Sequence, residues 1–199
     1  INFMGSKGKY LIFCRRGIDI DKYPSIKNHL KQYYIDLVPK SVESDRRGRK
    51  KGDYQWFEIQ DSISYYKEFE KPKIIYPEIA MSSRFTLDEK STYLNKTVFL
   101  IPTDDKFLLS ILNSKLIWYY LMNVCTSLGD PKNRGRLNLQ KVYLETIPII
   151  TSKIENRENL SILASNQLQN HKKLSSYISR VTELIENRYN IEKMSTKIN

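Results

Sequence analysis

Three short apolar runs are separated by polar segments in the first hundred residues. They are "YLIFC" at residues 10–14, "PKIIYPEI" at 72–79 and "TVFLI" at 97–101. Runs of this length that are rich in β-branched and aromatic residues predict strands. Between the first two runs, apolar residues recur every three to four positions, with Pro24 before them and Pro39 after them. This spacing predicts a helix.

Residues 107–123, "FLLSILNSKLIWYYLMN", form the most apolar stretch and predict a single core helix. Thr103 is expected to cap it, with Asp104 and Asp105 in its first turn. The polar "NSK" at 113–115 makes the stretch a poor membrane span, and it is expected to face a strand end or to form local hydrogen bonds. The predicted buried face consists of Leu108, Ile111, Leu112, Leu116, Tyr119 and Met122.

The composition changes near residue 151. "VYLETIPII" at 142–150 predicts a last strand or extended segment, whereas residues 153–194 contain neither glycine nor proline. Mostly apolar positions then alternate at spacings of four and three, which is typical of a coiled-coil helix. The stripe expected to pack consists of Leu160, Leu174, Ile178, Val181 and Ile185. We therefore predict an α+β fold, with a small mixed-sheet domain and packed helices over residues 1–150 and a long helical tail over residues 151–199.

The positive charge of the chain indicates that the protein binds a polyanion. Lys and Arg total 33 against 22 Asp and Glu, a formal net charge of +11, while 40% of the residues are hydrophobic. A basic domain with a core points first to nucleic acid as partner. The alternative is a basic protein whose charge has no specific partner. Cys14 and Cys125 lie in apolar sequence and predict buried thiols in a reducing, cytoplasmic compartment.

Three polar segments carry the residue types that contact nucleic acid, although each one could also be an ordinary solvated loop. Arginine and asparagine form bidentate hydrogen bonds with guanine and adenine, and clustered cations bind phosphates. "RRGRKKG", "MSSRF" and "DPKNRGR" are the three segments. The predicted phosphate-binding residues are Arg46, Arg47, Arg49, Lys50, Lys51, Lys132 and Arg136. The predicted base-reading residues are Ser83, Arg84, Asn133 and Arg134.

Catalytic and metal-binding patterns are scarce. His29 and His171 are far apart, and neither lies near a cysteine or carboxylate at metal-ligand spacing. Phosphate-binding and nucleophile motifs are missing from the sequence. The weak alternative is a magnesium-dependent nuclease that uses Asp45 or Asp53 with Glu58 of "EIQ". We expect no catalytic residue and no metal site in this chain.

The order of several segments resembles a known family. "YLIFCRRGIDIDKYPSIKNHLKQYYIDL", "YQWFEI", "PKIIYPEIA", "LLSILNSKLIWYYL", "SLGDPKNRGRLN" and "YLETIPI" together resemble the TaqI-like C-terminal specificity domain, from about Tyr10 to Ile149. This target recognition domain is attached to DNA methyltransferases of restriction–modification systems, including fused type IIG enzymes. The helical tail is similar, more loosely, to the spacer helices of type I specificity subunits.

The resemblance implies a sequence-specific DNA recognition module of a prokaryotic restriction–modification methyltransferase, non-catalytic by itself. It implies a methyltransferase domain upstream or in a partner chain, and Ile1 in place of a start methionine agrees with an excised fragment. S-adenosylmethionine and magnesium are then expected only in the absent catalytic domains, and no cofactor is expected here. Double-stranded DNA is the expected partner and no membrane is involved. Alternatives are the nuclease and a subunit whose helical tail docks a methyltransferase or self-associates.

Overall fold

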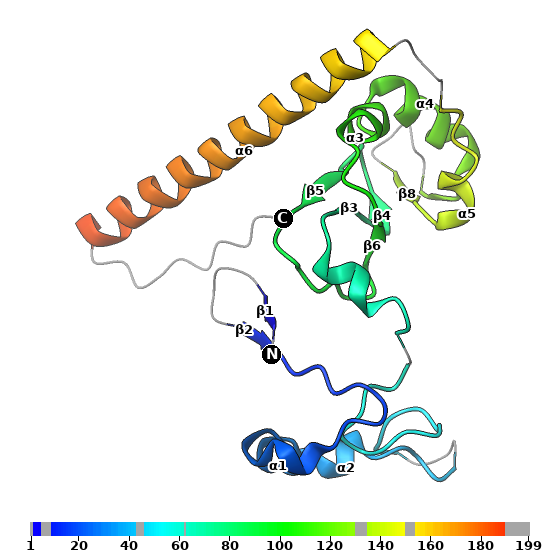
Figure 1. Ribbon diagram of the computed structural model, residues 1–199, viewed down its shortest axis with the longest axis vertical. Helices are drawn as coiled ribbons and strands as arrows, with labels where there is room; N and C mark the ends of the chain where they lie inside the picture. The colour runs from blue at the N-terminus through cyan, green and yellow to red at the C-terminus, as the bar shows by residue number, and fades with distance from the viewer. Residues whose placement is uncertain are drawn as a thin grey trace. The chain divides into compact units, whose positions relative to one another are not determined.

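The computed structural model describes residues 2–4, 9–42, 46–61, 63–129, 135–149 and 154–189, with side chains from residue 11 onward except those of 154 and 155. The chain divides into two compact units (Figure 1). Unit 1 comprises Ile1–Pro72 and Asp88–Asn95, and unit 2 comprises Lys73–Leu87 and Lys96–Asn199. Strands, helices and a long C-terminal helix are all present, so the predicted α+β class is confirmed.

Unit 1 consists of short elements joined by turns. They are β1 (Asn2–Met4), β2 (Lys9–Leu11), η1 (Ile20–Lys22), α1 (Pro24–Lys31), α2 (Tyr34–Leu37) and η2 (Tyr66–Glu70). The sequence predicts one helix between Pro24 and Pro39, but the structure has two, α1 and α2. The chain leaves helical geometry at Tyr33, whose φ is −110° and ψ 15°. The strand predicted at 10–14 covers only the end of β2, since the carbonyl of Cys14 instead accepts a hydrogen bond from the amide of Ile59 at 2.8 Å.

Aromatic rings supply much of the interior of unit 1. Phe69 and Tyr93 are buried, and their ring centroids lie 5.1 Å apart. Phe13 packs on Tyr93 at 5.4 Å. Such tilted ring pairs add about 0.5–1.5 kcal/mol each beyond the area that they bury. Aromatic packing therefore holds together a unit whose longest helix has only eight residues.

Unit 2 contains two three-stranded sheets and most of the aliphatic core. The first sheet has the order β5-β3-β6, with β3 at Lys73–Pro77, β5 at Thr86–Asp88 and β6 at Val98–Ile101. The second has the order β4-β8-β7, with β4 at Ile79–Ala80, β7 at Ser127–Leu128 and β8 at Arg136–Asn138. The strands predicted at 72–79 and 97–101 are confirmed as the antiparallel pair β3 and β6.

The apolar stretch from Phe107 to Asn123 is not the single helix that its pattern predicts. It forms α3 (Lys106–Leu112) and α4 (Lys115–Val124), separated by Asn113 and Ser114. The Ser114 hydroxyl accepts a hydrogen bond from the amide of Ile117 at 3.2 Å and so caps α4. This break changes which side chains face inward, and Leu116 and Tyr119 are 70% and 64% exposed rather than buried.

Two further local predictions are corrected. The cap of α3 is Asp105, not Thr103, because the Asp105 carboxylate accepts from the amides of Phe107 and Leu108 at 2.8 and 3.2 Å. Thr103 supports the cap by accepting from the amide of Asp105 at 3.2 Å. The start of the segment predicted as a strand or extended segment at 142–150 is instead helical, in α5 (Lys141–Leu144).

The core of unit 2 lies between its sheets and the helices α3 and α4. Its most deeply buried members are Ile74, Leu121, Leu137 and Leu139, each no more than 1% exposed. Burial raises the pKa of the Cys125 thiol to about 11, and burial with the nearby Glu145 carboxylate raises the pKa of Tyr76 to about 12. Both cysteines are buried and free, as predicted.

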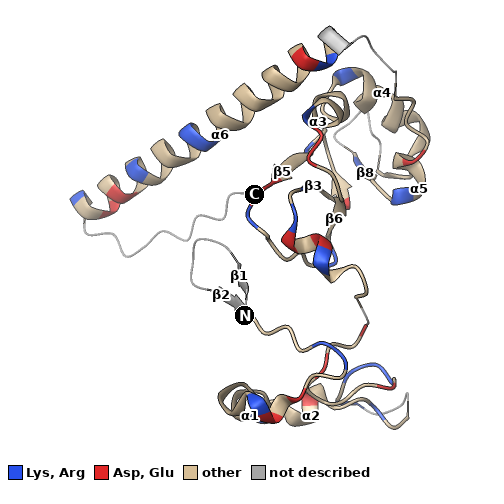
Figure 2. Ribbon diagram, in the orientation of Figure 1, with Lys and Arg blue, Asp and Glu red and all other residues tan. Residues whose placement is uncertain are grey.

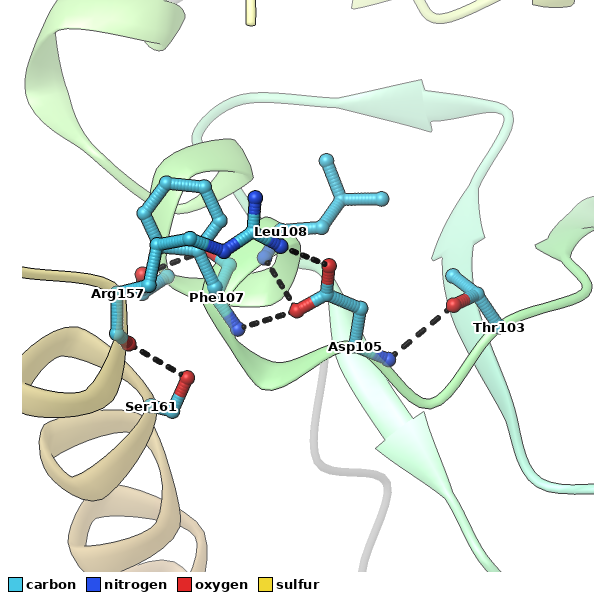
Figure 3. Close-up of polar contacts among 7 residues, drawn as sticks. Thr103, Asp105, Phe107, Leu108, Arg157 and Ser161 are labelled. Carbon is cyan, nitrogen blue, oxygen red and sulfur yellow. Dashed lines mark hydrogen bonds and ion pairs between the residues drawn. The ribbon is translucent and has the colours of Figure 1, made fainter. Parts of the chain in front are cut away.

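The N-terminal part of the C-terminal helix α6 (Ile154–Tyr189) packs against α3. Arg157 donates to the Asp105 carboxylate at 3.3 Å, and its guanidinium lies over the Phe107 ring at 4.4 Å (Figure 3). Ala164 is buried, and Leu168 packs against the core. The long helix predicted for the tail is confirmed. Of its expected packing stripe, Leu160 is partly buried, whereas Leu174, Ile178, Val181 and Ile185 are exposed.

Candidate nucleic-acid interface

One end of the β4-β8-β7 sheet carries the segment with Ser83 and Arg84, the two candidate base-reading residues that lie within the described residues. Antiparallel pairing places Ala80 opposite Leu137 and Leu128 opposite Arg136. The C-terminal ends of β4 and β7 therefore lie at the same edge as the N-terminal end of β8. The segment with Ser83 and Arg84 leaves this edge directly after β4. The sequence could not predict that β4 ends beside the end of β7 and the start of β8, because β4 lies about 50 residues earlier in the chain.

The hairpin that joins β7 to β8 begins and ends at the same edge. Gly129 has a φ of +89°, and a Cβ built on it would lie 3.8 Å from the Cα of Gly135. Lys132, Asn133 and Arg134, which were predicted to contact DNA, belong to this connection but lie outside the described residues. Arg136 is exposed, as that prediction requires.

The outward face of the same sheet adds a residue that the sequence did not indicate. Residues two apart on a strand share a face, so Asn138 lies on the face of Arg136, opposite Ile79 of β4. Ile79 and Leu128 are exposed on this face, whereas Ala80 and Leu137 on the other face are buried. The signal that could have found Asn138 is the alternation within "RLN", once that tripeptide is known to be a strand.

Two buried polar side-chain atoms in and beside the β4-β8-β7 sheet have no hydrogen-bond partner. They are Ser83 Oγ and Asn138 Oδ1, and within the described part of the chain no other buried side-chain nitrogen or oxygen lacks a partner. An unpaired buried acceptor costs about 1–3 kcal/mol, so each example in a folded protein requires an explanation. Both lie in the segments that carry Arg84 and Arg136. Ser83 follows the C-terminal end of β4, whereas Asn138 is the last residue of β8, at the opposite end of the sheet.

The backbone beside Arg84 is clamped by Asn113, the residue at the break between α3 and α4. The Asn113 carboxamide accepts from the amide of Phe85 at 3.1 Å and donates to the Phe85 carbonyl at 2.9 Å. It also donates to the carbonyl of Leu109 at 3.1 Å. The polar "NSK" thus makes both the strand-end and the local contacts that its pattern predicts. Arg84 is exposed and adjoins a rigid residue, since the Phe85 side chain is buried in the core.

The basic loop of unit 1 divides into cations that brace the fold and cations that face solvent. Arg47 donates to Asp36 through two hydrogen bonds of 2.9 and 2.7 Å. These bonds and the charge of Arg47 lower the pKa of the Asp36 carboxyl. Arg49 donates to the carbonyls of Leu37 and Trp56 at 2.7 and 3.0 Å. Both guanidiniums therefore already have partners within the chain.

The remaining cations of the loop, Arg46, Lys50 and Lys51, are exposed, and Figure 2 shows basic positions along the segment after α2. The loop returns close to the backbone after α2, where the amide of Arg49 donates to the Val38 carbonyl at 3.0 Å. Gly48 allows this approach, because its φ is +98° and a Cβ there would lie 2.7 Å from the Val38 oxygen. The exposed cations are thus held on a fixed turn.

The carboxylate of the alternative nuclease site has a structural role. Glu58 is buried, and its two oxygens accept from the amides of Gly17 at 2.6 Å and Gln55 at 2.8 Å. Burial and this negative charge raise the pKa of the nearby Cys14 thiol. Asp53 is exposed, and Asp45 lies outside the described residues. In the described segments, no group of three His, Cys, Asp or Glu residues is placed to hold a metal ion.

Replacing Glu58 with alanine is expected to lower the free energy of unfolding by about 2–3 kcal/mol, because two amides of unit 1 would lose their acceptor. The measurement is urea denaturation followed by tryptophan fluorescence. Glu68→Ala is the matched control, because Glu68 pairs only with the exposed Lys71, at 2.7 Å, and should cost under about 1 kcal/mol. If the two variants are equally stable, Glu58 does not brace unit 1.

The family of the chain follows from its match to a described domain. A family model, the TaqI-like C-terminal specificity domain, matches residues 13–149. The chain belongs to this family. TaqI-like specificity domains are the non-catalytic parts of restriction–modification enzymes that choose a DNA sequence and associate with a methyltransferase. The match covers the basic loop of unit 1, the clamped Arg84 segment and the β4-β8-β7 sheet. None of the helices in the described part of the chain combines the length and apolarity that crossing a membrane requires.

Proposed function

We propose that this TaqI-like specificity domain reads a short duplex DNA sequence through the edge of the β4-β8-β7 sheet. We assign base reading to Ser83 and Arg84 at this edge, to Asn133 and Arg134 in the connection between β7 and β8, and to Asn138 on the exposed face of the same sheet. The observation that supports this edge is the exposed Arg84, which follows β4 and adjoins Phe85, whose backbone is held by two hydrogen bonds of Asn113. Arginine and asparagine are suitable donors because they match guanine and adenine edges bidentately.

The exposed cations Arg46, Lys50 and Lys51 would supply affinity without sequence preference. They are exposed on the turn braced by Arg47 and Arg49. Phosphate contacts position a protein on DNA, whereas base contacts specify the sequence. In unit 2, the exposed Arg136 and the hairpin residue Lys132 would do the same. Of the residues predicted together as phosphate ligands, we therefore propose Arg47 and Arg49 as supports of the turn and the others as phosphate contacts.

The recognised DNA would be presented to a methyltransferase, in the same chain or in a partner, that flips a base into its own pocket. S-adenosylmethionine and magnesium would be bound by those catalytic parts, in a prokaryotic cytoplasm. The recognition role would belong to residues 1–150, with residues 151–199 as a spacer. Family membership supports this division, because the specificity domain selects the site and carries no methyl-transfer chemistry itself.

Selection from a random duplex library tests the recognition role directly. The full chain is incubated with the library at one fixed salt concentration, and the bound fraction is amplified and sequenced over several rounds. We expect enrichment of one short motif. Retention of DNA with no enriched motif would contradict sequence recognition by this chain alone, while still agreeing with a basic protein that binds any polyanion.

Replacing Lys50 and Lys51 together with alanine should weaken binding to all duplexes alike. Each lost phosphate contact lowers the slope of log K against log salt by about 0.9, so the double variant should lose about 1.8. Fluorescence anisotropy over a series of salt concentrations measures the slope. Lys67→Ala with Lys71→Ala removes the same charge from the exposed surface of η2 in the same unit. Equal slopes for the two double variants would show that the Lys50–Lys51 turn contributes only net charge.

A further inference from the structure

The side chain of Tyr54 connects the basic turn at residues 46–51 to the interior of unit 1. Tyr54 is 8% exposed, although the four residues immediately before it, 50–53, are all exposed. Its hydroxyl donates a hydrogen bond to the carbonyl of Lys50. A buried tyrosine hydroxyl usually takes a hydrogen-bond partner. Here the partner is the backbone of one of the two lysines to which we assign phosphate binding.

Two guanidinium groups lie over the ring of Tyr54. The Cζ atom of Arg49 lies 4.8 Å from the ring centroid, and the Cζ atom of Arg16 lies 5.5 Å from it. Both distances are within the range of cation–π attraction. Arg16 also donates to the carbonyls of Asp53 and Gln60, the latter at 3.0 Å. The ring of Tyr54 and the residue before it are therefore held by side chains from two separate segments of unit 1.

Gly52 lies directly against the same ring. A Cβ built on Gly52 would lie 2.7 Å from Cε1 and 2.9 Å from Cδ1 of Tyr54. Carbon atoms in favourable contact are about 3.5–4.0 Å apart, so an alanine at this position would displace the ring or the turn. The φ of Gly52 is not in the left-handed region, so the chain needs glycine here for space and not for its backbone conformation.

The hydrogen bond of the Tyr54 hydroxyl fixes the peptide that joins Lys50 to Lys51. A peptide plane is rigid, so it turns only about the backbone bonds on either side of it, which are ψ of Lys50 and φ of Lys51. A hydrogen bond to the carbonyl of this plane restricts both rotations. The two lysine side chains, which are exposed, start from the Cα atoms at the two ends of this peptide. Tyr54 therefore determines where both ammonium groups begin.

We propose that Tyr54 is a positioning residue for phosphate binding, which holds the Lys50–Lys51 peptide in the orientation that directs both ammonium groups to the backbone of duplex DNA. This role rests on the phosphate contacts proposed above for the same turn. Ordering a flexible segment on binding costs free energy, so a turn that is ordered beforehand binds more tightly. Tyr54 is buried and does not itself contact DNA. Its effect on affinity therefore passes through the two lysines.

Tyr54→Phe keeps the ring under both guanidiniums and removes only the hydroxyl. Fluorescence anisotropy with a scrambled duplex should show binding that is roughly 3- to 10-fold weaker, the effect of losing one hydrogen bond. The matched control is Tyr93→Phe, because Tyr93 is 4% exposed and its hydroxyl donates to the Glu70 carboxylate of the same unit at 3.1 Å. The control should bind like the parent. Equal affinity of Tyr54→Phe and the parent would overturn the proposal, and so would an equal loss in both variants.

Gly52→Ala is a second variant that reaches the same ring in another way. It leaves the hydroxyl of Tyr54 in place but pushes the ring from its position, since the new Cβ would lie 2.7 Å from Cε1. We expect this variant to weaken binding at least as much as Tyr54→Phe. Circular dichroism and urea denaturation check that both variants are folded under the conditions of the binding measurement. A folded Gly52→Ala protein that binds like the parent would contradict the positioning role.

A double-mutant cycle shows whether the effect passes through the lysines. Tyr54→Phe is introduced into the protein that carries Lys50→Ala and Lys51→Ala. We expect almost no further loss of affinity there, because the groups that Tyr54 positions have been removed. The same 3- to 10-fold loss in both backgrounds would give Tyr54 a purely structural role and overturn the proposal.

The same proteins separate a failure of this inference from a failure of the proposed function. If Lys50→Ala with Lys51→Ala changes the salt slope no more than its Lys67 and Lys71 control, the turn does not bind phosphate, and the positioning role fails with it. If the two lysines do account for the slope but Tyr54→Phe is neutral, only the positioning role fails. Loss in Tyr54→Phe that disappears without the lysines is the result expected.

Discussion

Replacing Arg84 with alanine is expected to weaken binding to the cognate duplex by about 1–3 kcal/mol, and binding to scrambled DNA much less. Arg84 is exposed. It follows β4, whose C-terminal end lies beside the N-terminal end of β8, where Arg136 is the first residue. The next residue, Phe85, is held by its buried ring and by the two hydrogen bonds of Asn113. A guanidinium aimed from a fixed backbone loses little freedom on binding, so its contact can discriminate between bases.

Arg84→Lys separates base reading from simple attraction. Lysine keeps the positive charge but lacks the planar fork that forms two hydrogen bonds with guanine. If Arg84 reads a base, the lysine variant should lose cognate affinity and specificity at one position of the site, while its binding to scrambled DNA stays near that of the parent. The measurement is anisotropy on both duplexes at one salt concentration. Equal losses on both duplexes for Arg84→Ala would make Arg84 a phosphate contact.

Arg134, in the connection between β7 and β8, can be tested with the same cognate and scrambled duplexes. Arg134 and Arg84 were predicted together, because each lies on a polar loop beside a regular element. Arg134→Ala is expected to cost a similar 1–3 kcal/mol on the cognate duplex if it reads a base. A result in which neither arginine shows a cognate-specific loss would place base reading on other residues.

Replacing Asn113 with alanine should lower the free energy of unfolding by about 2–4 kcal/mol, the largest stability effect that we expect from a single polar side chain here. The substitution removes three hydrogen bonds and leaves the amide and carbonyl of Phe85 without their partner. A backbone group that loses its partner costs about 1–3 kcal/mol where it is shielded from water. Thermal or urea denaturation of the full chain measures the loss.

The Asn113 substitution should also reduce sequence discrimination in the folded protein. The segment with Ser83 and Arg84 would lose its clamp, so cognate affinity should fall more than affinity for scrambled DNA. Asn123→Ala is the matched control, since Asn123 donates only to the Tyr119 carbonyl of its own helix at 2.7 Å. That variant should be near neutral in both stability and specificity. If Asn113→Ala is equally harmless, the clamp does not hold this segment.

The family, the fold class and the locations of the chief strands could be predicted from the order of the residues. Strand and helix patterns are local, and the segments "PKIIYPEIA", "LNSK" and "YLETIPI" have a fixed order that is itself a signal. The pI and the charged loops likewise indicated a polyanion as partner, because net charge is a property of composition. The long tail helix was predictable from a stretch that contains neither glycine nor proline.

Contacts between distant residues decided the candidate site. Arg47 and Arg49 have the same residue type and nearly the same position as Arg46, yet their guanidiniums bond to Asp36, Leu37 and Trp56. A run of cations in the sequence cannot show which members are used inside the fold. Asn138 became a candidate only when the structure showed that "RLN" is a strand, because residues two apart on a strand share a face.

Contacts between distant residues also explain why the helix predictions were partly wrong. Apolar residues keep a helical spacing on both sides of "NSK", but the helix breaks where the Asn113 side chain bonds to the backbone of Phe85, 28 residues earlier. The heptad of α6 repeats over its whole length, whereas burial stops near Leu168 because α3 is short. Periodicity determines which face of a helix is apolar. Only the tertiary structure decides how much of that face has a partner within the chain, because burial requires a second surface.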